Sequence, residues 1–298
     1  MRTIILTLLS LLCLNGMAQN KLPDFSSEQV KQSNITMPYR MATIAPVEGE
    51  RPALVIYLHG GSSKGNDNTT QMGEQGIELI ANYLQQNRVN SLMLVPQCPK
   101  DKSWMGPMYG VLKAMIDRYT VGSDAQPATA DPDRVYIFGG SMGGTGTWGM
   151  LSAYPGLFAA AMPVAGNPSQ AVAENVAQTP VFTVMGTADA IMSVDTAADF
   201  ISRLNALGDD TQMETEEGWT HEDTCTKSYI PRRLEWVFAH KRGGETAIGG
   251  VEKSDAAVVA TTFVSVDGQR ALAPSRHGIY IKVERLADGT SRTRKAVL

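Results

Sequence analysis

The chain has 298 residues, of which 43% are hydrophobic and 19% are charged, and its formal net charge at pH 7 is −4. This composition is typical of a globular protein and excludes both an intrinsically disordered chain and an integral membrane protein. Residues 268–298 carry a net charge of +5, so the rest of the chain carries −9, which argues against nucleic acid as a partner of the main body.

The N-terminus has the pattern of a cleaved secretory signal peptide. Arg2 precedes an apolar run over residues 4–14, and the small residues Gly16 and Ala18 follow at the positions that a signal peptidase requires. The apolar run is too short to span a bilayer. We therefore expect residues 1–19 to be removed from an exported protein that is periplasmic, attached to the cell surface or secreted, with no stable membrane span.

Apolar runs and segments with helical spacing alternate over the next two hundred residues. The expected strands are 35–44, 53–58, 92–95, 134–138, 160–164, 181–185 and 211–215, and the expected helices are 77–86, 111–119, 142–153, 196–207 and 231–240. Most of these strands are continuously apolar, which is typical of a parallel sheet that helices cover on both faces. We expect an α/β domain over residues 20–242, with 35–44 as its edge strand, and chemistry at the carboxyl ends of the strands.

One of these strands leads into the motif Gly139-Gly140-Ser141-Met142-Gly143. A strand, a tight glycine turn with a central serine and a following helix together predict a nucleophile elbow, which holds the serine hydroxyl above the sheet. The small neighbours are needed because side chains at the flanking positions would collide. The short pattern is common, so the prediction depends on the strand and the helix around it.

A nucleophilic serine needs a histidine as base. The chain has four histidines: His59, His221, His240 and His277. His221 follows the last expected strand of the sheet and comes after Ser141 in the chain, which is the order of base and nucleophile in α/β-hydrolases. We therefore predict His221 as the catalytic base.

The acid that orients the base should follow the preceding strand. Asp189 comes shortly after the strand 181–185, at the same edge of the sheet as Ser141. Asp195 is the alternative, but it lies near the start of the next helix, where aspartate is a common capping residue. We predict that Asp189 completes the triad.

Two backbone N–H groups are expected to bind the oxyanion of a tetrahedral intermediate. One belongs to Met142, the residue after the nucleophile, and the other to Gly61 in the loop His59-Gly60-Gly61-Ser62. The alternative for the Gly-Gly pair is an ordinary turn that ends a strand. No phosphate-binding loop, cofactor motif or cluster of metal ligands is evident, so no cofactor and no metal are expected.

From residue 38 to residue 240 the chain resembles the bacterial α/β-hydrolase esterases related to polyhydroxybutyrate depolymerases and feruloyl esterases. The resemblance lies in several motifs in one order: Pro38-Tyr39-Arg40, Tyr57 to Gly61 with Asp67-Asn68, Pro96 to Pro99 followed by Trp104, Asp131-Pro132-Asp133-Arg134 before Gly140 to Gly144, Tyr154-Pro155 with Phe158-Ala159-Ala160, and Val164-Ala165-Gly166. It implies an α/β-hydrolase fold and acyl substrates such as acetyl or feruloyl esters on polysaccharides. In that setting Trp104 is expected either to stack on a sugar or aromatic acyl group or simply to pack.

Two departures from this family leave the triad intact. Met185-Gly186 stands before the acid where the family usually has His-Gly, and Ser62-Ser63-Lys64 replaces the usual Gly-Glu-Arg of the oxyanion loop. The shape of the acyl pocket could therefore differ.

The character of the chain changes after residue 242. Residues 243–298 begin with a glycine-rich linker, and three strand-like pieces follow at 258–266, 278–284 and 291–297, separated by the turn signals Asp267-Gly268 and Asp288-Gly289. This predicts a small β appendage. It resembles a type IX secretion sorting tail, which implies the secretion machinery as a partner; a plain β module is the alternative.

The sequence as a whole predicts an exported serine carboxylesterase that acts on a small-molecule or polysaccharide ester. A serine peptidase with the same triad and a non-catalytic binding protein of the same fold are the alternatives. Cys98 and Cys225 would remain in the mature chain, and whether they form a disulfide is left open by the pattern.

Overall fold

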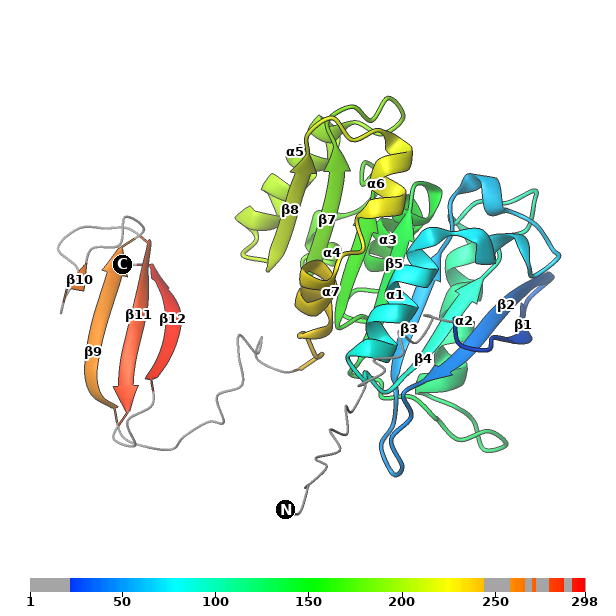
Figure 1. The fold of residues 1–298 in the computed structure, drawn as a ribbon, viewed down its shortest axis with the longest axis horizontal. Helices are drawn as coiled ribbons and strands as arrows, with labels where there is room; N and C mark the ends of the chain where they lie inside the picture. Colours follow the sequence, from blue (N-terminus) through cyan, green and yellow to red (C-terminus); the bar gives the residue numbers. More distant parts are fainter. Residues whose placement is uncertain (1–21, 244–257, 266–269, 272–278, 287–290, 298) are drawn as a thin grey trace, which may run out of the picture. The chain divides into compact units, whose positions relative to one another are not determined.

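The computed structural model describes residues 22–243 and the segments 258–265, 270–271, 279–286 and 291–297 (Figure 1). The chain divides between Gly244 and Glu245 into two compact units. The signal-peptide prediction for residues 1–19 lies outside the described residues.

The first unit is built on an eight-stranded sheet with the order β1-β2-β4-β3-β5-β6-β7-β8. Strands β1 and β2 are antiparallel to their neighbours, and β3 to β8 are parallel to one another. The strands are β1 (Ser26–Gln32), β2 (Ile35–Ile44), β3 (Ala53–Leu58), β4 (Ser91–Pro96), β5 (Val135–Gly140), β6 (Ala160–Val164), β7 (Val181–Gly186) and β8 (Thr211–Glu216). The five strands β3 to β7 are buried along their whole length, because helices cover both faces as their sequences predict.

Strand β1 was not expected, and it corrects the prediction that residues 35–44 form the edge of the sheet. Its sequence is mostly polar, and Val30 is its one buried residue. It therefore lacks the apolar run by which the other strands are recognised, and only its pairing with β2 makes it a strand.

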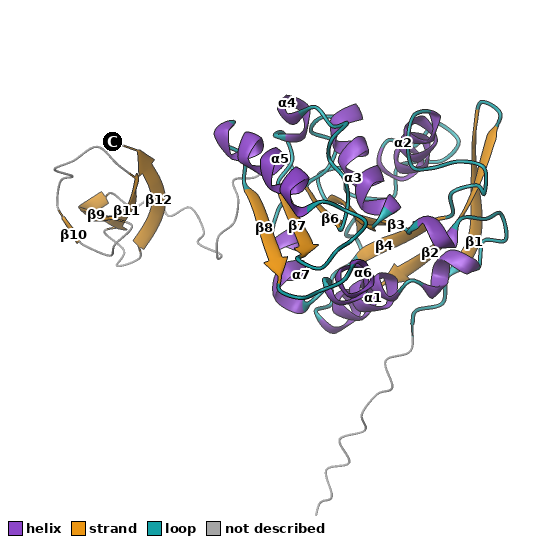
Figure 2. Ribbon diagram, turned by 90° about the horizontal axis from the view of Figure 1, so that it is seen from above, coloured by secondary structure: helices purple, strands orange, loops and turns teal. Residues whose placement is uncertain are grey.

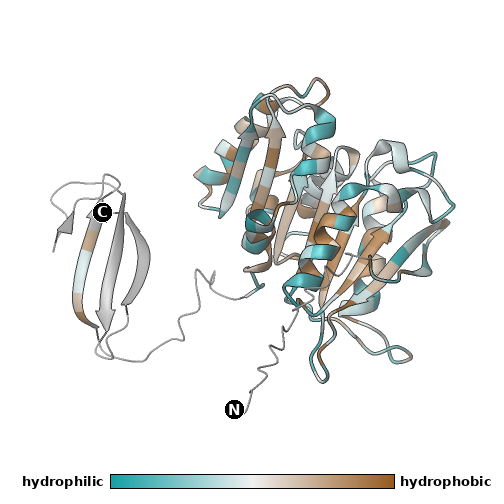
Figure 3. Ribbon diagram, in the orientation of Figure 1, coloured by the Kyte–Doolittle hydropathy of each residue, from teal (hydrophilic) through white to brown (hydrophobic). Residues whose placement is uncertain are grey.

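Helices form a layer on each face of the sheet, as Figure 2 shows from above. The helices are α1 (Gln75–Gln86), α2 (Pro107–Thr120), α3 (Met142–Ala153), α4 (Ala173–Val176), α5 (Val194–Ala206), α6 (His221–Lys227) and α7 (Pro231–Phe238). Helices α2, α3, α4 and α5 supply buried residues to one hydrophobic cluster, and α1 and α7 supply them to the other. Figure 3 shows hydrophobic residues along the central strands and mixed hydropathy on the helices, as a covered sheet requires. None of the described helices has the length and apolar character needed to cross a bilayer.

The second unit is a four-stranded antiparallel sheet with the order β10-β9-β11-β12. Its strands are β9 (Val258–Ser265), β10 (Arg270–Ala271), β11 (Ile279–Leu286) and β12 (Ser291–Val297). The expected β appendage is confirmed, and the two-residue strand β10 is an addition to it. Both predicted turns, at 267–268 and 288–289, lie outside the described residues.

Candidate active site

Ser141, Asp189 and His221 meet at the carboxyl ends of β5, β7 and β8. The Nε2 of His221 lies 2.8 Å from the Oγ of Ser141, and its Nδ1 lies 2.8 Å from the Oδ2 of Asp189. Because an ionised carboxylate can only accept, Nδ1 donates to Asp189, which leaves Nε2 as the acceptor for the serine hydroxyl. The structure thus brings the three predicted triad residues into one hydrogen-bonded chain.

The backbone of Ser141 has the conformation that a nucleophile elbow demands. Its φ is 57° and its ψ is −118°, a region that residues with a side chain rarely adopt. The Ser141 N–H donates to Val164 O of the next strand at 3.0 Å. A Cβ at Gly143 would lie 1.8 Å from Leu58 O, and one at Gly139 would lie 2.4 Å from Gly143 O. Gly143 is therefore required for helix α3 to approach strand β3 this closely, and Gly139 for strand β5 to approach helix α3.

Two backbone hydrogen bonds hold the Asp189 carboxylate in place, in addition to its contact with the histidine. Its Oδ1 accepts hydrogen bonds of 2.8 Å from the N–H groups of Ile191 and Met192, and its side chain is fully buried. Burial raises the pKa of this carboxyl, but the hydrogen bonds from Met192, His221 and Ile191 outweigh burial and leave the pKa below its ordinary value. Asp189 is therefore held as an ionised acceptor.

The alternative acid, Asp195, is exposed and lies in the first turn of α5. The N-cap of that helix is Ser193, whose hydroxyl accepts from Thr196 N–H. The structure thus places Asp189, and not Asp195, against the histidine.

Helix α6 begins at His221, the predicted catalytic base. A capping box between Thr220 and Asp223 begins this helix directly before His221, so the loop after β8 ends with the imidazole in place. Of the other histidines, His59 and His240 are buried and bonded elsewhere, and His277 lies outside the described residues.

The two expected oxyanion donors belong to the start of α3 and to the turn after β3. Met142 is the first residue of α3, so its N–H lies in the turn that has no acceptor within a helix. Gly61 begins a 3₁₀ turn, Gly61–Ser63, after β3. The preceding Gly60 packs against the nucleophile, since a Cβ added there would lie 3.7 Å from the Cβ of Ser141. Its own N–H donates to Glu74, which leaves Gly61 as the next donor of the turn.

Trp104 lies in the core and has no exposed surface. Its indole N–H donates to His59 O at 3.0 Å, and its ring meets the imidazole of His59 edge to face at 5.1 Å. The prediction that Trp104 stacks on substrate is therefore wrong, and the packing alternative holds. Gly146 of α3 packs against Trp104, since a Cβ added there would lie 2.3 Å from the Trp104 Cβ, and a motif after a strand end does not reveal this contact.

His59 is part of the same buried support for the oxyanion loop. Its Nδ1 donates to Gly60 O at 2.6 Å, and its Nε2 accepts from Cys98 N–H at 2.9 Å. Burial lowers the pKa of His59, consistent with a neutral imidazole that uses both nitrogens for structure.

Cys98 and Cys225 are not paired in the structure. Cys98 is buried in the core, whereas the Sγ of Cys225 lies 4.0 Å from the Nε2 of His221. Burial raises the pKa of each thiol to about 12, so both are neutral near pH 7. The position of Cys225 beside the triad was not predicted, although its spacing of four residues from His221 on one helix face is a signal that could have indicated it.

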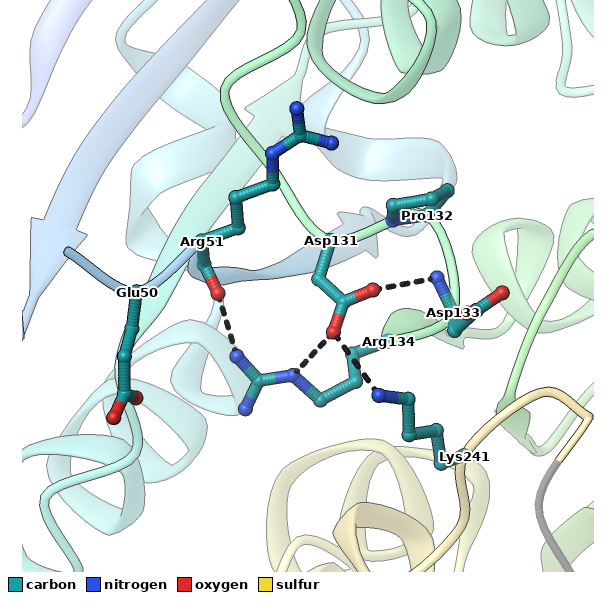
Figure 4. A pocket seen from close by; sticks show the side chains of 7 residues that line it. All are labelled: Glu50, Arg51, Asp131, Pro132, Asp133, Arg134 and Lys241. Carbon is teal, nitrogen blue, oxygen red and sulfur yellow. Dashed lines mark hydrogen bonds and ion pairs between the residues drawn. The ribbon is translucent and has the colours of Figure 1, made fainter.

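A surface pocket lies at the opposite edge of the sheet, at the amino ends of β3 and β5 (Figure 4). Asp131 binds Arg134 at 3.1 Å and Lys241 at 3.5 Å, and Arg134 also donates to Arg51 O at 2.7 Å. These bonds join the starts of two strands to the chain after α7, so the Asp-Pro-Asp-Arg motif has a structural role. The pocket is lined by Glu50, Arg51, Asp131, Pro132, Asp133, Arg134 and Lys241. Among the described residues, no group of three or more His, Cys, Asp or Glu side chains is arranged to hold a metal ion.

No protein-family model matches the chain, and no curated protein matches it. Solved structures, in contrast, do match the chain. A thermostable esterase is 28% identical over 74% of this chain and 64% of its own, with a TM-score of 0.66. The feruloyl esterase module from Clostridium thermocellum, in complex with sinapinate, is 14% identical over 75% and 91%, with a TM-score of 0.59. The acylaminoacyl peptidase of Pyrococcus horikoshii is 13% identical over 78% and 44%, with a TM-score of 0.56.

The chain thus spans less than two thirds of the length of both the thermostable esterase and the peptidase. The strand order, the nucleophile elbow and the similarity to these solved structures all indicate the same fold. The chain therefore has the α/β-hydrolase fold, and its structural neighbours, which are esterases and peptidases, support a hydrolase.

Proposed function

We propose that the chain is a serine carboxylesterase in which Ser141 is the nucleophile, His221 the general base and Asp189 the acid that orients the base. The single observation that carries this proposal is the pair of 2.8 Å contacts that link the three side chains. Three residues from three separate loops meet in the order that nucleophilic catalysis needs.

The reaction follows from this geometry. The Ser141 Oγ attacks the ester carbonyl carbon while its proton passes to His221 Nε2, and Asp189 stabilises the resulting imidazolium. The negative charge on the carbonyl oxygen faces the N–H groups of Met142 and Gly61. His221 then protonates the departing alcohol, leaving an acyl-enzyme. A water molecule attacks this ester, gives its proton to His221 and releases the carboxylic acid and the free Ser141 hydroxyl.

Ester substrates are favoured over amides by the relatives. The esterase has both the higher identity and the higher TM-score, whereas the chain spans 44% of the length of the acylaminoacyl peptidase. The ordered motifs shared with feruloyl esterases and polyhydroxybutyrate depolymerases support acetyl or feruloyl esters on polysaccharides as substrates. A peptidase is the second candidate because of that peptidase neighbour. The complete triad argues against a non-catalytic binding protein.

Hydrolysis of a nitrophenyl ester series, from acetyl through longer acyl groups to feruloyl, tests this proposal. Wild type is compared with Ser141→Ala and with Ser202→Ala, a matched control because Ser202 is an exposed serine on α5. We expect hydrolysis by wild type and by the control but not by Ser141→Ala. Folded wild type that cleaves aminoacyl nitroanilides but no ester would favour the peptidase, and inactivity on both would favour a binding protein.

Export is the second part of the proposal. The leader at residues 1–19 and the resemblance of residues 243–298 to a sorting tail support a protein that leaves the cytoplasm with help from the secretion machinery. N-terminal sequencing of the exported protein should start after residue 19. Deletion of residues 243–298 should retain the protein inside the cell if these residues are a sorting tail, whereas unchanged export would indicate a plain β module.

A further inference from the structure

Glu74, the residue before helix α1, holds both ends of the oxyanion turn. Its Oε1 accepts from the Gly60 N–H at 3.1 Å and from the Ser63 hydroxyl at 2.6 Å. Its Oε2 lies 3.5 Å from the hydroxyl of Tyr57 on β3. One carboxylate therefore ties the end of β3, the start of the turn and its last residue to the N-terminus of α1.

The clamped segment is short and lies against the nucleophile. Only Gly61 and Ser62 separate the two clamped residues, and the turn is closed again by Ser63 N–H to Gly60 O at 3.3 Å. Gly60 packs against Ser141, and Ser63 is buried. Because the residue before Gly61 and the residue two positions after it are both bonded to Glu74, this carboxylate constrains the direction of the Gly61 N–H.

The partners of Glu74 suit an acceptor that is fixed in place. All three are donors, and a carboxylate offers only acceptors. Burial raises the pKa of Tyr57 well above its ordinary value, so its hydroxyl keeps its proton and can donate. Without the carboxylate, the Gly60 N–H and the Ser63 hydroxyl would lose a partner in a partly buried place, and the turn would rearrange to find others.

We infer that Glu74 is a positioning residue of the oxyanion hole: through Gly60 and Ser63 it directs the Gly61 N–H toward the oxygen of the tetrahedral intermediate. This inference rests on the proposed function. Glu74 does not touch the reacting atoms, so its contribution should appear in the transition state and not in substrate binding.

The test is steady-state hydrolysis of nitrophenyl acetate by the full chain carrying Glu74→Ala, Glu74→Gln or Ser63→Ala. Glu78→Ala is the matched control, since Glu78 is an exposed glutamate one turn further along α1. We expect Glu74→Ala to lower kcat about 10-fold to 100-fold, less than the 10²–10³ that follows loss of a donor itself, with KM within about threefold. Glu74→Gln keeps one oxygen for Gly60 and Ser63 and should retain most of the activity.

Inhibition by phenylboronic acid separates positioning from a merely structural role. The tetrahedral boronate adduct of Ser141 places an oxygen in the oxyanion hole, so its inhibition constant should rise across the variants in parallel with the loss of kcat. A kcat for Glu74→Ala within twofold of wild type would overturn the inference. So would a loss of kcat with an unchanged boronate constant.

If Glu74→Ala shows no cooperative unfolding transition, the variant is not properly folded, and Ser63→Ala tests the inference instead. It removes one of the three donors, so kcat should fall about 3-fold to 10-fold with KM unchanged, and an unchanged kcat would overturn the inference. Labelling with a fluorophosphonate distinguishes this failure from failure of the proposed function. Wild type that neither labels at Ser141 nor cleaves esters overturns both, whereas labelled and active wild type beside a fully active Glu74→Ala overturns only the role of Glu74.

Discussion

The Oγ of Ser141 and the Nε2 of His221 lie 2.8 Å apart, although 80 positions separate the two residues in the chain. The serine belongs to a strained turn after β5 and the histidine to the first position of α6. Their contact exists because parallel strands bring the loops after β5, β7 and β8 to one edge of the sheet.

Replacing Ser141 by glycine should abolish activity and stabilise the fold relative to Ser141→Ala. Both variants lack the nucleophile, but only alanine keeps the side-chain strain at φ 57°. That strain is of order 1–3 kcal/mol, and the greater entropy of unfolded glycine offsets about 0.5–1 kcal/mol of it. Urea unfolding should therefore find Ser141→Gly more stable by about 1 kcal/mol. Equal stability of the two variants would argue against a strained elbow.

Replacing Asp189 by asparagine should lower kcat by about 10⁴-fold. The asparagine oxygen can still accept from Ile191 and Met192, but its NH₂ then faces the Nδ1 of His221. The imidazole would turn to the tautomer with a proton on Nε2, which cannot accept from Ser141. Steady-state kinetics should show this loss, whereas Asp195→Asn, in an exposed position, should stay within about twofold of wild type. The reverse pattern would make Asp195 the acid.

The carboxyl of Asp209, in the loop just before β8, should make the fold less stable as the pH rises from about 4 to about 6. Burial raises its pKa to about 6, and the nearby charge of Asp210 adds to this, whereas a hydrogen bond from Thr211 and the proximity of His240 oppose it. The native state then binds more protons than the unfolded state in this window, so the free energy of unfolding falls as pH rises.

Asp209→Asn removes this titration and should flatten that part of the profile. Allowing for partial exposure of the group, we expect the variant to be about 1 kcal/mol more stable than wild type at pH 7, and equal to it near pH 4. Urea unfolding at both pH values measures the effect. Asp124→Asn, in an exposed loop, is the control and should show the same dependence of unfolding free energy on pH as wild type. If Asp209→Asn also shows the wild-type dependence, the prediction is wrong.

The thiols of Cys98 and Cys225 should react slowly in the native protein. Burial raises the pKa of each to about 12, so few thiolates form at pH 7 to 8. Colorimetric titration with a disulfide reagent, without added reductant, should find little fast reaction before unfolding and both thiols after it. Absence of free thiols in the unfolded chain would show instead that the two cysteines pair.

The fold was largely predictable because its signals are local. The apolar runs of β3 to β7 and the spacing of the long helices follow from burial on both faces of a parallel sheet. The exceptions are informative. Strand β1 was not predicted because its residues are mostly polar. The indole of Trp104 is buried because elements distant in the sequence pack over it.

The sequence by itself determined the alternation of strands and helices, the elbow around Ser141 and the positions of His221 and Asp189 after their strands, because each depends on neighbouring residues and on chain order. The tertiary structure alone decided which groups touch. It placed Cys225 beside the histidine, gave Asp189 preference over Asp195, and brought Glu74 to the oxyanion turn. These contacts join residues from separate loops and helices, and only the packing of the sheet and its two helix layers sets the distances between them.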